Sequence, residues 1–222
     1  WITYLCGRPN CGNYTTVGRE TALDPVQWTD DGWFTVNNGR GPSIEQDSPN
    51  LTQTVYPKFE RDDFESERLN LNWEFVRNPN YEDFSLTERK GYARIYTGKG
   101  QLFELNAKNT VVRREEELCY SAETALEFEP VTTEQAGLTC YYSTATYIRF
   151  SVCKNKNSRV MELVINRNHG EEIIAQISDI PEGRVYLRIE VDHLTRKFYY
   201  GYDRDNMTLV DTIENCIFLC DE

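Results

Sequence analysis

Residues 185–191 read VYLRIEV, a run in which apolar and polar side chains alternate without a break. The four apolar residues would share one face of a β-strand, while Tyr186, Arg188 and Glu190 would share the other. A strand of this kind is half-buried, with its apolar face turned toward a second layer of the protein. The stretch therefore predicts a sheet that covers a hydrophobic core on one side.

The same pattern continues along the chain from residue 56 onward. Strand-like runs follow one another between short turns rich in Asn, Gly and Pro, and no helical period interrupts them. Many closely spaced strands without helices favour an antiparallel sandwich. We therefore predict an all-β fold with two large sheets, a concanavalin-like jelly roll. The runs we expect are 73–76, 84–88, 92–96, 111–128, 137–142, 147–153, 160–165, 173–177, 185–192, 197–202 and 208–213.

The N-terminal part of the chain has a different composition. Residues 1–40 carry short aromatic-rich strands but are too few to bury their large side chains, so they must pack on the sandwich or on something outside this chain. Residues 41–55 are rich in Asn, Gly, Ser and Pro and are typical of a linker. We expect three parts: an N-terminal section at 1–40, a linker at 41–55 and a sandwich at 56–222.

The charge balance excludes some partners. The 222 residues include 24 basic and 36 acidic side chains, for a net charge of −12. Nucleic acid and anionic membrane surfaces both need an excess of Lys and Arg, so neither is an expected partner. Neutral polysaccharide is compatible with this charge, because sugars bind through stacking and hydrogen bonds. No apolar run approaches the roughly 18 residues of a membrane span.

The cysteines do not form a metal motif in the sequence. Neither His169 nor His193 lies at a zinc-finger spacing from them, and most lie in apolar runs, as in Leu118-Cys119-Tyr120. We interpret them as small buried hydrophobic residues. The odd count favours reduced thiols and a cytoplasmic setting, while secretion stays an alternative, in which Cys6 with Cys11 and Cys216 with Cys220 are close enough to cross-link. The seven are Cys6, Cys11, Cys119, Cys140, Cys153, Cys216 and Cys220.

One stretch near the start is specific enough to indicate a family. Residues 18–33 read GRETALDPVQWTDDGW, preceded by Trp1, Tyr4-Leu5 and Gly7-Arg8-Pro9. This set resembles the end of the catalytic β-propeller in glycoside hydrolase family 43, in the branch of two-domain β-xylosidases and α-L-arabinofuranosidases. Later blocks resemble the C-terminal sandwich of the same enzymes; they include FERDDF at 59–64, LNWEFVRNP at 71–79, SLTER at 85–89 and YLRIE at 186–190.

The resemblance implies a function for the parent protein. It implies an inverting hydrolase of xylo-oligosaccharides or arabinoxylan side chains, in which one carboxylic acid and one carboxylate act on opposite faces of the sugar. In the family these carboxylates come from earlier propeller blades, and no Asp or Glu in residues 1–33 matches their motifs. We therefore expect this chain to be inactive alone and to need a missing propeller domain or chain. The family's Gly-rich final strand also has no counterpart before Glu222, so we expect the last strand of the sandwich to be missing. No cofactor is expected for the chemistry.

Arg19, in the Gly-Arg-Glu-Thr motif, is the main candidate for a binding residue. The resemblance implies that it reaches the sugar in the pocket, and a guanidinium donates in a fixed fork to adjacent hydroxyls. Glu20, Trp28 and Trp33 are secondary candidates. We interpret Glu20 as a structural neighbour of Arg19, and the two tryptophans as propeller core rather than stacking platforms.

Three further features each have two interpretations. Asp62 and Asp63 are candidate ligands for a structural calcium, although calcium takes 6 to 8 oxygens and a solvated turn is favoured. The charged run at 113–117 is interpreted as an exposed ladder on a strand. The aromatic stretches at 141–147 and 198–202 would line a sugar groove or, on alternate positions, fill the core.

Two other functions stay open beside the hydrolase. The sandwich alone would serve as a lectin-like module that binds xylan without chemistry. Alternatively, it would be a structural domain that holds the propeller or a homo-oligomer together.

Overall fold

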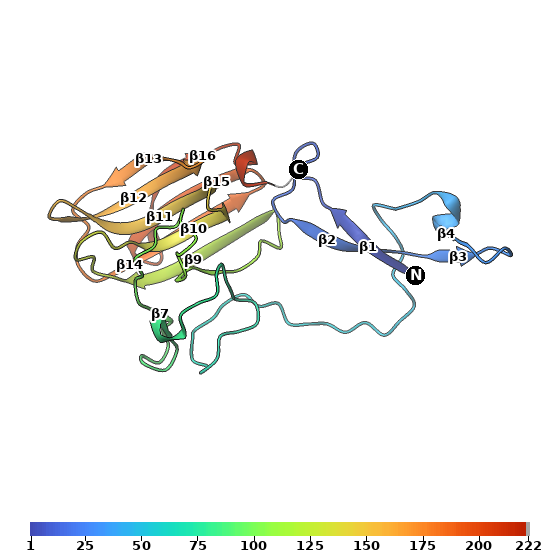
Figure 1. Ribbon diagram of the computed structural model, residues 1–222, viewed down its shortest axis with the longest axis horizontal. Helices are drawn as coiled ribbons and strands as arrows, with labels where there is room; N and C mark the ends of the chain where they lie inside the picture. Colours follow the sequence, from blue (N-terminus) through green and yellow to red (C-terminus); the bar gives the residue numbers. More distant parts are fainter. Residues whose placement is uncertain (221–222) are drawn as a thin grey trace.

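Two four-stranded antiparallel sheets form the body of the protein (Figure 1). The computed structural model describes residues 1–220. One sheet has the order β10-β11-β12-β13 and the other β16-β15-β14-β9, and the predicted all-β sandwich is confirmed. The strands are β9 (Cys119–Glu127), β10 (Ala136–Ser143), β11 (Thr146–Asn155), β12 (Ser158–Arg167), β13 (Gly170–Ile177), β14 (Arg184–Asp192), β15 (Thr195–Asp203) and β16 (Asn206–Ile213).

The core lies between the two sheets, where the alternating pattern predicted it. Every second residue of β14, from Val185 to Val191, is at most 4% exposed. Across the gap, Phe150 of β11 meets Phe198 of β15 edge to face, with ring centroids 5.7 Å apart. Such aromatic pairs add about 0.5–1.5 kcal/mol beyond the burial of their area. Both sheets therefore contribute apolar faces to a single core.

Residues 73–112 form shorter elements than the sequence predicts. The expected runs at 73–76, 84–88 and 92–96 shorten to strands of two residues each. The strands pair with each other, outside the two large sheets. The pairs are β5 (Glu74–Phe75) with β8 (Val111–Val112), and β6 (Phe84–Ser85) with β7 (Arg94–Ile95).

The charged run at 113–117 is not the strand ladder that we predicted. The expected strand 111–128 is broken between β8 and β9, and the segment from 113 to 118 is irregular. Glu115 turns inward instead, and its Oε2 lies 3.2 Å from Nη2 of Arg196. The Arg196 side chain is fully buried. A buried guanidinium needs a counter-charge, and the Glu115 carboxylate of this segment supplies it.

The N-terminal section consists of two small hairpins. One pairs β1 (Ile2–Gly7) with β2 (Arg19–Asp24), and the other pairs β3 (Val26–Trp28) with β4 (Phe34–Val36). Figure 1 shows β1 and β2 beside one end of the sandwich, with β3 and β4 farther from it and the following chain running back toward the sheets. The domain boundaries at 40 and 55 stay a prediction, since residues 40–73 contain no strand or helix.

Helical structure is minimal throughout the described residues. It is limited to three 3-10 turns, η1 (Asn37–Gly39), η2 (Tyr81–Asp83) and η3 (Ile217–Leu219). None of these turns has the length or apolar character that a membrane span requires.

Removing the Glu115 carboxylate should destabilise the fold strongly. Glu115→Ala leaves the buried Arg196 without its counter-charge, a loss of about 3 kcal/mol in the free energy of unfolding. Urea unfolding measures this loss. Glu116→Ala is the matched control, because the Glu116 side chain is 54% exposed, and it should change the free energy by less than about 0.5 kcal/mol. Equal losses in the two variants would contradict the buried-pair argument.

Candidate functional site

Arg19 lies beside a hollow between β1, β2 and the loop that joins them. It is the first residue of β2 and pairs with Gly7, the last residue of β1. Its side chain is exposed, and none of the ion pairs found among residues 1–220 uses its guanidinium. Its donors are therefore free for hydroxyl groups of a ligand. The hollow has a volume of ≈ 380 Å³ and is lined by Leu5, Cys6, Gly7, Pro9, Gly12, Asn13, Thr15 and Arg19.

Glu20 lies on the opposite face of β2 and binds a different arginine. Arg8 donates from Nε to Glu20 Oε2 at 3.1 Å and from Nη2 to Oε1 at 3.0 Å. The same Nη2 also donates to the carbonyl of Glu116 at 2.9 Å. The pair is partly exposed and contributes little energy by itself. Its role is to hold Arg8 where it also reaches the carbonyl of Glu116. Arg8 connects the hairpin that carries Arg19 to the sandwich, a role that its Gly-Arg-Pro setting did not reveal.

Asp24, at the end of β2, is a buried hub that the sequence analysis missed. The hydroxyls of Ser43 and Tyr4 donate to its carboxylate. Asn37 Nδ2 donates at 2.7 Å, the Ser43 backbone N at 3.1 Å and Gln46 Nε2 at 3.4 Å. The hydrogen bonds from Ser43, Tyr4 and Asn37, in that order, hold the pKa of the Asp24 carboxyl well below its usual value. The hub ties both hairpins to the start of the linker.

The secondary aromatic candidates lie away from the hollow. Trp28 and Trp33 are 72% and 73% exposed, and neither lines the hollow at Arg19. Trp28 packs edge to face on Phe34 with ring centroids 5.7 Å apart. Large rings this exposed are typical of surfaces that pack on another protein segment. Their role as propeller core stays a prediction.

The calcium candidates have protein partners. Asp62 accepts hydrogen bonds from the Phe64 backbone N at 2.8 Å and from Trp73 Nε1 at 2.9 Å. Asp63 pairs with Arg61 at 2.6 Å. Among residues 1–220, the pair does not join a third Asp, Glu, His or Cys in a compact group. A calcium ion here stays a prediction.

The aromatic stretches of the sandwich are largely engaged with their neighbours. Tyr141 stacks on the buried Tyr147, with ring centroids 6.3 Å apart. Tyr199 donates through its hydroxyl to Glu190 at 3.0 Å. The exposed rings Tyr142 and Tyr202 belong to different sheets, on β10 and β15. These rings therefore do not combine into one stacking platform.

Four of the seven cysteines follow the prediction of burial, Cys6 is half-buried, and Cys11 and Cys119 are exposed. Cys140, Cys153, Cys216 and Cys220 are buried, and none of the seven cysteines forms a disulfide within residues 1–220. Cys119 is exposed, so its interpretation as a buried residue was wrong. The alternation of β9 explains this, because the neighbouring Tyr120 packs against the core and Cys119 consequently points outward.

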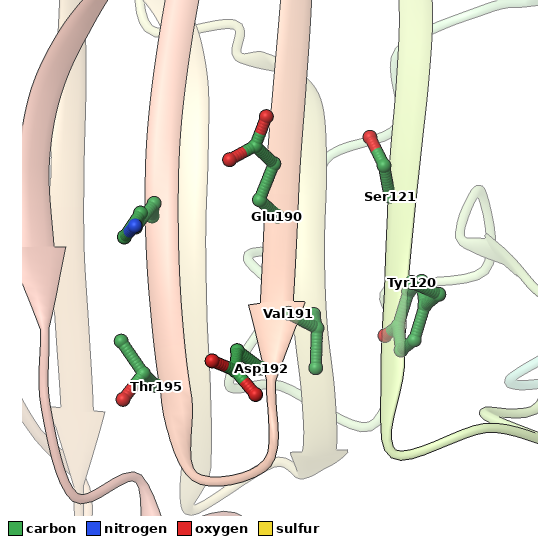
Figure 2. Close-up of a pocket in the computed structure, with 7 residues that line it drawn as sticks. Tyr120, Ser121, Glu190, Val191, Asp192 and Thr195 are labelled. Atoms are coloured by element: carbon green, nitrogen blue, oxygen red, sulfur yellow. The ribbon is translucent and has the colours of Figure 1, made fainter.

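Cys119 lies instead in a group with Asp192 and His193. Its Sγ is 3.4 Å from Asp192 Oδ1 and 3.4 Å from His193 Nδ1, and the latter two atoms are 2.8 Å apart. A second hollow, of ≈ 370 Å³, begins at Asp192 and extends over β9, β14 and β15 (Figure 2). Besides Asp192, its polar lining residues are Tyr120, Ser121, Glu190, Thr195 and Lys197. The sequence held no signal for this group, because Cys119 is 73 residues from Asp192 along the chain.

The Asp24 hub should make the N-terminal section sensitive to acid. A carboxyl whose pKa is lowered on folding contributes its full stability above its unfolded pKa of about 3.9, and this contribution begins to fall below that pH and is lost as the pH passes through the lower folded pKa. Urea unfolding followed by tryptophan fluorescence at pH 7 and at about pH 3.5 measures this, since Trp1, Trp28 and Trp33 are three of the four tryptophans. At pH 7, the Asp24→Asn variant should have a lower free energy of unfolding than the wild type. This free energy should also change less between pH 7 and about pH 3.5 than it does in the wild type.

The exposed Asp30 provides the control for that experiment. Asp30→Asn should unfold like the wild type at both pH values, because its side chain is solvent-exposed. An unchanged pH dependence in Asp24→Asn would show that the hub is not responsible.

Comparison with known proteins agrees with this architecture. The chain is 44% identical to the GH43 protein BlXynB of Bacillus licheniformis, whose crystal structure matches with a TM-score of 0.93 over 99% of this chain and 43% of that chain. It is 30% identical over 230 residues to a β-xylosidase of Bacillus subtilis (strain 168), covering 95% of this chain and 42% of that protein. It is also 31% identical over 205 residues to the non-reducing end α-L-arabinofuranosidase BoGH43B of Bacteroides ovatus, covering 89% of this chain and 38% of that protein.

These matches confirm the resemblance seen in the sequence motifs. The chain spans about two fifths of the length of the curated relatives that it matches. The family model of the β-xylosidase C-terminal concanavalin A-like domain matches residues 61–222, which is well over half of the chain. The chain therefore belongs to the GH43 family of β-xylosidase C-terminal concanavalin A-like domains.

Proposed function

We propose that the chain is the C-terminal portion of an inverting glycoside hydrolase that acts on xylo-oligosaccharides or arabinoxylan side chains. In this proposal a propeller outside the chain supplies the catalytic acid and base. The chain supplies Arg19 to the sugar pocket and a sandwich that supports the pocket from behind. The relatives named as a β-xylosidase and an α-L-arabinofuranosidase support this class of substrate.

The observation that carries the proposal is the position of Arg19. Its guanidinium is unpaired among the described residues, it is exposed, and it borders a hollow at the end of the β1–β2 hairpin. A free guanidinium beside a concave surface is suited to a ligand with adjacent hydroxyls. An arginine that served only the fold would instead be expected to pair with a carboxylate, as Arg8 does with Glu20.

The exposed apolar surface of the N-terminal section supports a missing partner. Trp1 is 50% exposed, Leu5 63%, and the two tryptophans of the second hairpin more than 70%. A domain folded to completion rarely leaves so many large apolar side chains in water. In the proposal, the other propeller blades cover these side chains.

The contacts of Arg8 indicate how the sandwich would contribute to the proposed enzyme. This arginine joins Glu20 on β2 to the carbonyl of Glu116, in the segment that precedes β9. Catalysis needs the groups that touch the substrate to be held within a fraction of an ångström. We infer that the sandwich contributes to the reaction by fixing the hairpin that carries Arg19.

A xylan-binding module without chemistry is the second candidate. The aromatic side chains on the sandwich would be its basis, but Tyr147 is buried and Tyr199 is bonded to Glu190. In the two aromatic stretches at 141–147 and 198–202, the large exposed rings are Tyr142 and Tyr202, which lie on separate sheets. This distribution favours the supporting role over the binding role.

The chain by itself should have no glycosidase activity. We expect no turnover of aryl xylosides or aryl arabinosides by the purified 222-residue chain, because the acid and base lie elsewhere in the proposed enzyme. Measurable turnover that a point change within the chain abolishes would contradict the proposal. Retention of the chain on insoluble xylan in a pull-down would favour the binding module instead.

Arg19 should matter for the reaction when the chain is joined to its propeller. In that enzyme, Arg19→Ala should lower kcat/KM at least ~10-fold, since a charge-assisted hydrogen bond contributes about 1.5–3 kcal/mol and each 1.36 kcal/mol is one decade. Arg19→Lys should recover little, because an ammonium cannot make the forked contact. Steady-state kinetics measure both variants.

The matched control for Arg19 is a residue of the same strand face. Thr21→Ala alters the exposed side chain two positions away and should keep near-normal kcat/KM. The urea midpoint of Arg19→Ala should equal that of the wild type, because the side chain is exposed and unpaired. Wild-type kcat/KM in Arg19→Ala would remove Arg19 from the proposal.

A further inference from the structure

We propose that Cys119, Asp192 and His193 form a binding site for a divalent transition-metal ion of the zinc type. The ion would be bound by Cys119 Sγ, Asp192 Oδ1 and His193 Nδ1. These atoms all lie within 4.8 Å of one another. Among residues 1–220, no other three His, Cys, Asp or Glu side chains bring their ligand atoms this close together. The proposal is independent of the hydrolase function, since the site is at the turn between β14 and β15 and Arg19 is not part of it.

The backbone holds the three residues in place before any ion binds. Cys119 is the direct partner of Asp192 in the pairing of β9 with β14. The His193 backbone N donates to the carbonyl of Leu118 at 2.8 Å, which fixes the turn against the start of β9. Strand pairing and this hydrogen bond together fix the backbone at the three residues, which lowers the entropic cost of bringing their side chains together on an ion.

The distances between the donor atoms suit tetrahedral coordination. With Zn–S bonds near 2.3 Å and Zn–N and Zn–O bonds near 2.0–2.1 Å, a tetrahedral ion separates S from N or O by about 3.5 Å and N from O by about 3.3 Å. The two observed distances from Cys119 Sγ are both 3.4 Å. The distance from Asp192 Oδ1 to His193 Nδ1 is 2.8 Å and must open by about 0.5 Å. Both side chains are more than half exposed and free to make this adjustment.

The chemistry of the donors selects the class of ion. A thiolate with an imidazole favours zinc and neighbouring transition metals, whereas calcium and magnesium prefer sets made of oxygen atoms. Three protein ligands leave a fourth position for water or another ligand. Asp192 also borders the second hollow, together with Ser121 and Glu190 (Figure 2).

A nucleophilic cysteine is the main alternative for the same three side chains, and the geometry disfavours it. In a catalytic triad the histidine contacts the nucleophile through one ring nitrogen and the carboxylate through the other. Here Nδ1 of His193 faces both Cys119 Sγ and Asp192 Oδ1. Donor atoms converging on one point, rather than in a relay, are the arrangement that an ion requires.

Cobalt(II) titration tests the site directly. The untagged, metal-free and fully reduced 222-residue chain is titrated with Co²⁺, and the near-ultraviolet thiolate-to-cobalt absorption is followed. We expect one equivalent to bind and Zn²⁺ to displace it. Cys119→Ser should abolish the thiolate absorption. His193→Asn and Asp192→Asn should each weaken Co²⁺ binding at least ~10-fold, as even the loss of a supporting residue weakens metal sites by 10- to 100-fold.

The chain offers close controls for the cysteine and the histidine. Cys11 is also an exposed thiol, and Cys11→Ser should leave the spectrum unchanged. His169 also occupies a left-handed position in a hairpin turn, with φ +66° against +54° for His193, so His169→Asn tests for the backbone effect of the substitution. As a second measurement, Zn²⁺ should raise the Tm of the wild type but not of Cys119→Ser.

Three outcomes would overturn the proposal. The first is the absence of a thiolate absorption in the wild type. The second is an absorption that persists in Cys119→Ser, which would place the ion on another thiol. The third is an absorption that depends on Cys119 but is unaffected by both His193→Asn and Asp192→Asn, since the ion would then be held by an isolated thiol.

Discussion

The burial of two apolar sheet faces against each other is the constraint on which the rest of the structure depends. Each sheet has an alternating pattern, and its apolar side can leave water only by meeting the other sheet. The contact between Phe150 and Phe198 lies within this layer. Once the faces meet, the register of every long strand is set, because a slip of one residue would turn its apolar side chains outward.

The polar contacts around this core attach the remaining segments. Glu115 reaches the buried Arg196, Arg8 reaches the carbonyl of Glu116, and Asp24 gathers donors from the start of the linker. Each of these contacts joins residues of two different segments of the chain. The N-terminal hairpins are therefore held by directional bonds, while their large apolar side chains stay in water. In the proposed enzyme, propeller blades outside this chain would cover these side chains.

The outward faces of the sheets carry the chemistry because the inward faces are used for packing. Tyr120 packs against the core, and its neighbour Cys119 consequently points to solvent beside Asp192 and His193. Similarly, Glu20 and Arg19 are adjacent in β2 but point in opposite directions, one to Arg8 and the other to the hollow. In both strands, a period of two separates a structural residue from a residue available for binding.

The sequence by itself determined the fold class, the faces of the long strands, the family and Arg19 as the residue to examine. These follow from local pattern and from motifs, which neighbouring residues carry. Only the tertiary structure decided the partner of Glu115, the burial of Asp24 and the exposure of Cys119. Cys119 and Asp192 are 73 residues apart, and Glu115 and Arg196 are 81 residues apart. Contacts of this kind depend on which strands pair and in which register, and no local periodicity encodes that choice.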